Sequence, residues 1–269
     1  MENFLLSEGD IVQIENLSPR HRKSWIITLN NGGSYSTHLG IIFHDECIGR
    51  SFGDTLILTG GRVILLKPTP RDLIRSFQLK TQILYEDDCA TMCSLAGVTS
   101  GMRVGEAGSG SGALTTFLAS AIQPTGHVYS FDINGKHLEN AQNNVEKTGL
   151  IEYVSFSVHD IREPLDVRGL DAFFLDFATP FDAINTVAAV LCGGGRLVCF
   201  VPSWGQVEQT VAQIQRNPFF RFRNALEITR RNFVIDPNKH IMRPTFRDLV
   251  YSGILIHAIR IIPPREMLS

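Results

Sequence analysis

The segment "VGEAGSGSG", residues 104–112, constrains the fold more than any other part of the chain. It places Gly108, Gly110 and Gly112 at alternate positions directly after a short apolar run, and a helical pattern, "GALTTFLASAI", follows at once. A glycine-rich turn between a strand and a helix is typical of α/β sheets, where backbone N–H groups can approach a ligand at the helix N-terminus. An unrelated tight turn is the alternative that the glycines alone leave open.

Helical and strand patterns alternate on both sides of this turn. The strand patterns are near-continuous apolar runs, which are typical of strands covered on both faces. We therefore predict an α/β fold with a doubly wound, Rossmann-like sheet. The predicted strands are residues 101–107, 126–133, 154–160, 170–177 and 194–202, and the predicted helices are 86–98, 112–122, 136–149, 181–192 and 204–215. Residues 222–235 and 249–261 are predicted to be two strands of an antiparallel hairpin at one edge.

The N-terminal part has a different pattern. Short alternating runs between residues 8 and 68 are separated by turn signals, and Asn31–Gly33 and Gly60–Gly61 are typical of tight hairpin connections. These patterns predict a small antiparallel sheet or barrel. Two prolines in "KPTPRDLIRSF" mark the change of period. We expect a small β-rich domain at residues 1–70 and a catalytic domain at residues 71–269.

Composition narrows the class of protein. The 269 residues are 43% hydrophobic and 19% charged, which is ordinary for a globular protein. The five cysteines are odd in number and lie mostly in apolar segments, which favours free thiols in a reducing compartment. Cys89 and Cys93 lack a second Cys/His pair at ligand spacing, so we expect no metal site. The N-terminus resembles no signal peptide and no apolar run reaches membrane-spanning length, so we expect a cytoplasmic protein without membrane association.

Three classes of ligand use a glycine-rich turn of this kind. A triphosphate site needs a lysine after the last glycine, and none follows Gly112. A dinucleotide site has the spacing GxGxxG, whereas this chain has GxGxG. The third class is S-adenosylmethionine, whose ribose requires a carboxylate. Asp132, at the end of the next predicted strand, is placed to accept hydrogen bonds from both ribose hydroxyls.

Carboxylates also follow the third and fourth strands. His159 and Asp160 end the third strand, where the adenine edge of such a ligand would lie, although a solvated Asp at the start of a turn is the alternative. Asp176 follows an apolar run and would be costly to bury without a partner. We expect Asp176 at the strand tip beside the methyl donor.

The C-terminal third has a local basic bias. Although the net charge is −2, residues 216–247 contain many arginines and only two acidic residues, Glu227 and Asp236. Scattered solvated side chains would explain this composition equally well. A polyanionic partner becomes the better interpretation if other residues indicate one.

Together the motifs resemble one family, the tRNA adenine-N1 methyltransferases that modify position 58 in the T loop. The similarity covers almost the whole chain. The segments that carry it are "THLGIIFHDECIGRSFGDTLILTGGRVILLKPTPRDLI", "TQILYEDD", "EAGSGSGALTTFLA", "GGRLVCFVPSWGQVEQTV" and "IMRPTFRDLVYSGILIHAIR". The chain departs from the family pattern at Asp132, where Glu is usual, at Phe181, where Trp is usual, and at Tyr251, in place of the histidine of "GHTG".

The resemblance implies roles for particular residues. It implies that Asp176 is catalytic. With tRNA as the substrate that the resemblance implies, we expect Tyr85, Phe181 and Trp204 to be candidates for stacking on the base, and Arg231 and Arg243 of the basic stretch to bind phosphates. Each aromatic residue alone could equally be a core or rim residue. The expected binding residues for S-adenosyl-L-methionine are Gln82, Glu106, Gly108, Ser109, Gly110, Ser111, Gly112, Ala113, Asp132, His137, His159, Asp160 and Asp176.

The resemblance also implies a reaction and an assembly. Transfer of the methyl group to N1 makes the adenine cationic, and Asp176 beside N1 and N6 would stabilise that charge. A T-loop adenine must leave its stack to be reached. We expect tRNA as the partner and a homotetramer as the assembly, as in the family. The alternatives are a methyltransferase acting on another substrate and a non-catalytic RNA-binding subunit of a two-protein enzyme.

Overall fold

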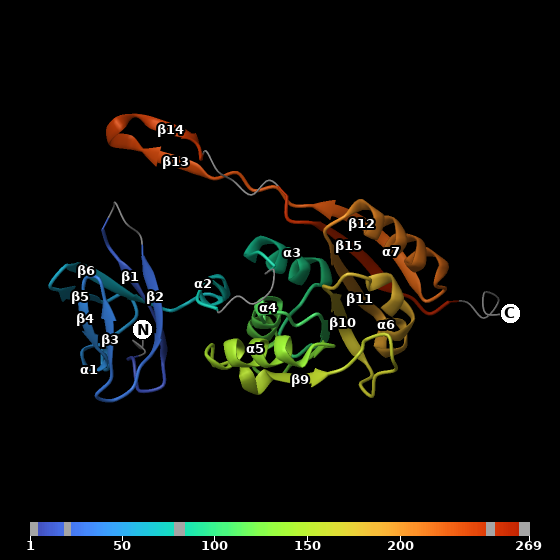
Figure 1. Cartoon of the computed structure of the whole chain (residues 1–269), viewed down its shortest axis with the longest axis horizontal. Coiled ribbons are helices and arrows are strands. Elements are labelled where there is room, and N and C mark those ends of the chain that lie inside the picture. Colours follow the sequence, from blue (N-terminus) through green and yellow to red (C-terminus); the bar gives the residue numbers. More distant parts are fainter. Residues whose placement is uncertain (1–4, 19–22, 78–83, 246–250, 264–269) are drawn as a thin grey trace. The chain divides into compact units, whose positions relative to one another are not determined.

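A computed structural model of the chain describes residues 5–18, 23–77, 84–245 and 251–263 (Figure 1). The chain divides into two compact units, Met1–Gln78 with Asn143–Leu150, and Leu79–Gln142 with Ile151–Ser269. We propose that the boundary between the two domains lies after residue 70. The helix α2, Pro70–Arg75, begins at that point, where Thr69 caps its N-terminus.

The first unit is an antiparallel sheet in the order β2-β1-β6-β5 with a separate two-stranded sheet, β3-β4. Alternate side chains of the central strands point into one core, which includes Ile14 and Leu65, because neighbouring residues of a strand face opposite sides. The elements are β1 Ile11–Asn16, β2 Ser24–Thr28, β3 Ser34–Thr37, β4 Gly40–Phe43, α1 His44–Cys47, β5 Thr55–Leu58 and β6 Gly61–Leu66.

One of the two predicted hairpins in this unit is confirmed. Strands β5 and β6 pair directly through the turn at Gly60–Gly61, with Leu58 opposite Gly61. The hairpin predicted at Asn31–Gly33 is wrong, because β2 pairs with β1 and the strand after the turn, β3, pairs with β4. The prediction relied on the turn residues, and these do not determine which strand the polar segment "SYST" of β3 pairs with.

The second unit contains a seven-stranded sheet in the order β12-β15-β11-β10-β7-β8-β9. The strands from β11 to β9 run parallel, and β15 is antiparallel to both of its neighbours. This confirms the predicted α/β fold. The strands are β7 Arg103–Ala107, β8 His127–Asp132, β9 Val154–Val158, β10 Leu170–Leu175, β11 Leu191–Val201, β12 Phe220–Glu227 and β15 Ile254–Arg260.

Helices cover this sheet and explain why its strands are apolar along their length (Figure 1). Helix α3 packs on α4 and β11, α4 on β7 and β8, α6 on β11, and α7 on β12 and β15. Phe173, Leu175 and Leu197 are fully buried in the core beneath α6 and α7. The helices are α3 Glu86–Ala96, α4 Ala113–Ile122, α5 Gly135–Glu146, α6 Ile184–Val190 and α7 Trp204–Arg216, with short 3-10 turns η1 Ile151–Tyr153, η2 Pro180–Ala183 and η3 Pro237–Lys239.

The C-terminal prediction is partly wrong. Strands β12 and β15 pair antiparallel at one edge as expected, but the strand predicted over residues 222–235 ends at Glu227. Residues Phe233–Asp236 form another strand, β13, which pairs with β14, Ile241–Pro244. Between these two strands, Arg230 forms ion pairs with the first turn of α3, at 3.2 Å from Glu86 Oε1 and 2.5 Å from Asp87 Oδ2.

Two kinds of feature are absent from the described part of the chain. No described helix is long and apolar enough to cross a membrane. Among the described residues, no cluster of three or more His, Cys, Asp or Glu side chains is arranged to hold a metal ion. All five cysteines have free thiols.

Candidate functional site

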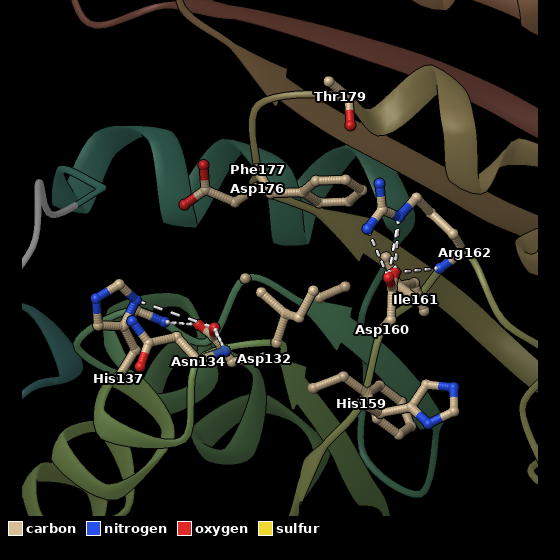
Figure 2. A pocket seen from close by; sticks show the side chains of 15 residues that line it. Asp132, Asn134, His137, His159, Asp160, Ile161, Arg162, Asp176, Phe177 and Thr179 are labelled. Atoms are coloured by element: carbon tan, nitrogen blue, oxygen red, sulfur yellow. Dashed lines mark hydrogen bonds and ion pairs between the residues drawn. The ribbon is translucent and has the colours of Figure 1, made fainter.

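The candidate site lies where the strand order of the large sheet reverses. Strand β7 comes first among the parallel strands and has β8 on one side and β10 on the other. In sheets of this kind ligands bind at the carboxyl ends of the strands beside that reversal. A cavity of about 560 Å³ opens there, as Figure 2 shows. It is lined by Ala107, Gly108, Gly110, Phe131, Asp132, Ile133, Asn134, His137, His159, Asp160, Ile161, Arg162, Asp176, Phe177 and Thr179.

The glycine turn forms one wall of this cavity. Gly108, Gly110 and Gly112 have φ of 92°, 54° and 82°, the left-handed region that favours glycine. A Cβ on Gly108 would also overlap the backbone carbonyl oxygen of Asp176. The backbone N–H of Asp176 donates to the carbonyl of Ala107 at 2.9 Å. The glycines therefore let the ends of β7 and β10 meet at the floor of the cavity.

Asp132 ends β8 and faces the same cavity. It is 8% exposed, and its two oxygens accept from the backbone N–H groups of Gly110, at 3.2 Å, and Asn134, at 2.8 Å. His137 Nδ1 lies 3.9 Å from Asp132 Oδ1. Because each carboxylate oxygen can accept more than one hydrogen bond, Asp132 can also receive a pair of hydroxyl groups.

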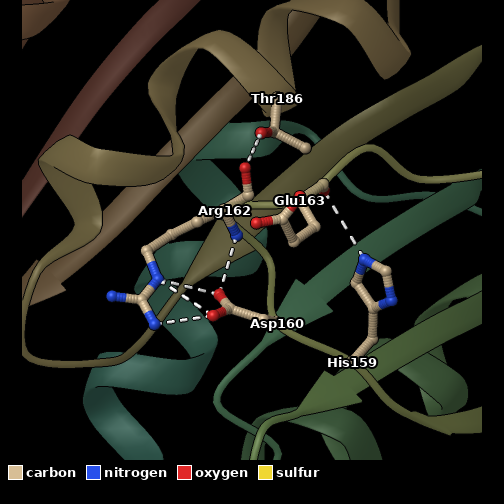
Figure 3. Close-up of polar contacts among 5 residues, drawn as sticks. All are labelled: His159, Asp160, Arg162, Glu163 and Thr186. Atoms are coloured by element: carbon tan, nitrogen blue, oxygen red, sulfur yellow. Dashed lines mark hydrogen bonds and ion pairs between the residues drawn. The ribbon is translucent and has the colours of Figure 1, made fainter.

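Asp160, which we expected at the adenine edge or as a solvated residue of a turn, lines the cavity and is bound to a neighbouring arginine. The side chain of Arg162 donates to the Asp160 carboxylate through Nε, at 2.9 Å from Oδ1 and 3.1 Å from Oδ2, and through Nη2, at 2.6 Å from Oδ2. The Arg162 backbone N–H also donates to Asp160 Oδ1, at 3.0 Å (Figure 3). These bonds lower the pKa of Asp160 to about 2. Thr186 Oγ1 donates to the Arg162 carbonyl at 3.2 Å, and His159 Nε2 lies 3.5 Å from the carbonyl of Glu163. The wall of the cavity that follows β9 is therefore a turn whose conformation is held by these hydrogen bonds.

Glu106 lies beneath the glycine turn and is 1% exposed. Its Oε2 accepts from Thr115 Oγ1 at 2.6 Å and from Ser130 Oγ at 2.8 Å, and Ser130 Oγ also contacts Ser109 Oγ at 2.7 Å. Burial raises the pKa of Glu106 to about 7. A narrow cleft contains both the predicted residues of the glycine turn and the carboxylates of Glu106 and Asp176. Its lining consists of Leu84, Glu106, Gly108, Ser109, Gly110, Ser111, Ala113, Leu114 and Asp176.

A second cavity, of about 540 Å³, meets the first at Asp176 and Phe177. Its lining consists of Leu84, Tyr85, Asp176, Phe177, Ala178, Phe200, Pro202, Gln206 and Ser252. Burial, together with the charges of Asp88 and Asp132, raises the pKa of Asp176 to about 7. A carboxylate is thus placed where two cavities meet, each large enough for a small ligand.

The predicted substrate residues are distributed unevenly. Tyr85 lines the second cavity, whereas Phe181 and Trp204 are not among the described lining residues of either cavity. Trp204 begins α7 and is 74% exposed. Arg231 is exposed after β12, and Arg243 lies on β14 with its Nη1 bound to the Pro244 carbonyl at 3.2 Å. Gln82 lies outside the described residues.

Several lining residues were not predicted. Phe177 directly follows the predicted residue Asp176, and Arg162 lies two residues after the predicted residue Asp160; this proximity was the signal that could have identified them. Phe200 and Ser252 carry no such signal. Phe200 lies near the end of β11 and Ser252 lies two residues before β15 begins. The antiparallel pairing of these strands, in which Ile254 is opposite Val201, brings the two residues together.

Comparisons with known proteins point to one family. The family model described as the tRNA methyltransferase complex GCD14 subunit matches residues 61–247, and a model described as TrmI-like N-terminal matches residues 5–55. The chain is 27% identical over 240 residues to the tRNA (adenine(58)-N(1))-methyltransferase catalytic subunit trmt61a of Dictyostelium discoideum, covering 86% of this chain and 75% of the relative. It is also 27% identical to the tRNA (adenine(58)-N(1))-methyltransferase TrmI of Thermus thermophilus, covering 89% of this chain and 94% of that protein.

Two crystal structures resemble the chain over nearly its whole length. One is described as a SAM-dependent O-methyltransferase from Thermotoga maritima, with a TM-score of 0.83, 30% identity, and coverage of 97% of this chain and 96% of that chain. The other is the tRNA (m1A58) methyltransferase TrmI from Aquifex aeolicus, with a TM-score of 0.75, 25% identity, and coverage of 96% and 99%.

Proposed function

Because the chain belongs to the family of the tRNA methyltransferase complex GCD14 subunit, we propose that it transfers a methyl group from S-adenosyl-L-methionine to N1 of adenine 58 in the tRNA T loop. The observation that carries this proposal is the position of Asp176 between a cavity suited to the donor and a second cavity suited to a base. A tRNA substrate and free thiols are both compatible with the cytoplasmic location that we infer.

The residues of the first cavity fit the donor. Gly108 and Gly110 line the cavity without side chains, so a ligand can lie directly against the backbone there. In this proposal Asp132 holds the ribose hydroxyls, with His137 beside it, and the wall formed by His159 and Asp160 borders the adenine. The methionine end lies against Glu106 and the turn Ser109–Ala113. S-adenosyl-L-methionine, when bound, supplies an electrophilic methyl group on a positively charged sulfur.

Asp176 acts on the acceptor base in this account. Adenine N1 has a lone pair at neutral pH, so no base is needed to expose it. The base gains a positive charge as N1 is methylated, and an ionised carboxylate beside N1 and N6 stabilises that charge. Tyr85, Phe177 and Phe200 line the cavity with aromatic surface on which a base turned out of its stack can lie.

One observation favours a second candidate function. The Thermotoga structure is described as an O-methyltransferase. Methylation of a hydroxyl requires a base to take its proton, and a carboxylate with a pKa raised to about 7 is suited to that task. The acceptor would then be an oxygen atom instead of N1 of a base.

Analysis of the reaction product separates the two candidates. Unmodified tRNA would be incubated with the purified protein and S-adenosyl-L-methionine labelled in the methyl group, and the nucleosides analysed by mass spectrometry after digestion. Label in N1-methyladenosine supports the proposal. Label in an O-methylated nucleoside, or transfer only to acceptors other than tRNA, contradicts it.

We also propose that the chain assembles with itself through the sheet β13-β14, as a homotetramer. The register places Phe233 opposite Pro244 and Ile235 opposite Met242, so these four side chains share one face. That face is solvent-exposed, with Ile235 64% and Met242 74% exposed. A two-stranded sheet is marginally stable by itself and gains from burying such a face.

A further inference from the structure

A buried carboxylate, Asp88, lies behind the second cavity. It is on the first turn of α3 and is 2% exposed. It accepts a hydrogen bond from Ser252 Oγ at 2.8 Å and another from the backbone N–H of Tyr85. Ser252 and Tyr85 both line the cavity. One side chain outside the lining therefore holds two parts of it that are far apart in sequence.

The bond to Asp88 fixes what the Ser252 hydroxyl can offer the cavity. An ionised carboxylate only accepts hydrogen bonds, so the single hydroxyl proton of Ser252 is directed at Asp88. The oxygen of Ser252 keeps only its lone pairs for a ligand. Ser252 therefore acts in the cavity as a hydrogen-bond acceptor and not as a donor.

One other polar side chain of the lining, that of Gln206, is already engaged. Gln206 donates through Nε2 to the Ala178 carbonyl at 2.8 Å and accepts through Oε1 from Ser203 at 2.7 Å. Asp176 is the second acceptor in the cavity. Besides the Tyr85 hydroxyl, the cavity thus offers aromatic walls and two acceptors, which match a flat ring that carries an amino group.

Gly253, the residue after Ser252, allows Ser252 to line the second cavity. A Cβ on Gly253 would overlap the ring of Phe200, which is itself part of the lining. The bare backbone at Gly253 lets the chain that follows Ser252 lie against the aromatic wall. Ser252 is therefore positioned by Asp88 on one side and by this close approach on the other.

We infer that the Ser252 hydroxyl, positioned by Asp88, accepts a hydrogen bond from the exocyclic amino group of the target base and so selects adenine over 6-oxopurines. This inference rests on the proposed function. The amino group has two hydrogens, and Asp176 and Ser252 supply one acceptor each. A 6-oxo group would instead present its lone pairs to those of Ser252, and buried acceptors left without donors disfavour binding.

The test compares two tRNAs that differ by one functional group. One carries adenine at position 58 and the other carries purine, which keeps the N1 lone pair and lacks the amino group. The quantity measured is the ratio of kcat/KM for adenine to kcat/KM for purine. The lower intrinsic reactivity of purine affects every variant equally, so a lower ratio reports a hydrogen bond to the amino group that the variant no longer makes.

Ser252→Ala should lower this ratio by about five- to tenfold, the value of one hydrogen bond. Ser252→Thr keeps the hydroxyl and should restore the ratio. Ser155→Ala is the matched control, since Ser155 Oγ also makes one side-chain hydrogen bond, to His127 at 2.7 Å, but does not line either cavity. Its ratio should equal that of the unaltered protein.

Asp88→Asn tests the positioning role. An amide at residue 88 can donate to the Ser252 oxygen, so the hydroxyl proton is free to turn toward the base. We expect the ratio to fall at least threefold. If this variant does not fold, Ser252→Ala still decides whether the hydrogen bond to the amino group exists, and Asp88→Glu, which keeps the carboxylate, takes the place of Asp88→Asn: a longer side chain displaces the Ser252 hydroxyl and should lower the ratio.

Each outcome has one interpretation. Equal ratios for the unaltered protein and Ser252→Ala would overturn the hydrogen bond to the amino group. A ratio unchanged by Asp88→Asn, with a lowered ratio in Ser252→Ala, would overturn the role of Asp88. A failure of the unaltered protein to methylate the adenine tRNA would contradict the proposed function itself, which the ratios do not address.

Discussion

Asp176 is the residue on which the proposed chemistry depends. Its backbone N–H is bound to the end of β7, and its carbonyl oxygen lies against Gly108, so its place at the junction of the cavities is set by the backbone. The charges of Asp88 and Asp132 disfavour a third negative charge nearby. A cationic ligand on either side of Asp176 would relieve that repulsion.

Removal of the Asp176 carboxylate should affect turnover far more than donor binding. Asp176→Ala should lower kcat by about 10²- to 10³-fold, because it removes a charge that stabilises the transition state. The affinity for S-adenosyl-L-methionine, measured by calorimetry, should stay within roughly tenfold, because Asp132 and the glycine turn remain. Asp166→Ala removes an exposed carboxylate and serves as the control. Unaltered turnover in Asp176→Ala would refute the mechanism.

The dependence of the reaction on pH should follow the ionisation of Asp176. Since the active form is the carboxylate and its pKa is raised to about 7, kcat/KM should fall as the pH drops below about 7. Asp88→Asn removes a negative charge that raises this pKa, so the acid limb should move to lower pH. Glu106 also has a pKa raised to about 7, but Asp88 is not among the causes of that shift. An acid limb that does not move in Asp88→Asn would exclude Asp176 as its source.

At the scale of elements, the first turn of α3 connects the site to the C-terminal part of the chain. Asp88 holds Ser252, and Glu86 and Asp87 hold Arg230. In the sequence, Arg230 precedes and Ser252 follows the segment that contains β13 and β14. The sequence shows the acidic run "EDD", but only the fold shows that its partners come from the far end of the chain.

The exposed apolar face of β13-β14 should determine the assembly. Ile235→Lys combined with Met242→Lys places two charges on this face and should lower the mass measured by sedimentation velocity. Ile262→Lys is the control, because Ile262 is 79% exposed and lies outside the sheet β13-β14. The proposal fails if the unaltered chain is a monomer or if the double variant keeps the original mass. A stable complex only with a second kind of chain would also contradict it.

The opposite face of β13-β14 carries Arg243, next to Val234 across the strands. We predict that Arg243→Ala and Arg231→Ala each weaken tRNA binding. The slope of log K for tRNA against the logarithm of the salt concentration should become shallower by about one unit for each phosphate that is no longer bound. Affinity for S-adenosyl-L-methionine should not change. Lys147→Ala removes an exposed charge elsewhere and is the control. Equal losses of tRNA and donor affinity would show that these arginines do not act on RNA.

For the whole molecule, the sequence was most informative where function depends on local geometry. The glycine turn and the carboxylates at strand ends were identifiable, because the ends of parallel strands meet wherever the sheet reverses its order. The closeness of Ser252 to Phe200 was not identifiable, because only the antiparallel pairing of β15 with β11 brings them together. The strand β13 was misassigned, because local apolar alternation does not reveal which strand a segment pairs with.

The measurement that tests the central claim most directly is the position of the methyl group in tRNA. Unmodified tRNA and a variant with uridine in place of adenine 58 would each be incubated with the protein and S-adenosyl-L-methionine, and the products mapped nucleotide by nucleotide. The account predicts N1-methyladenosine at position 58 of the first tRNA and no methyl transfer to the second. Equal methylation of both, or a methyl group on another atom of position 58, would contradict it.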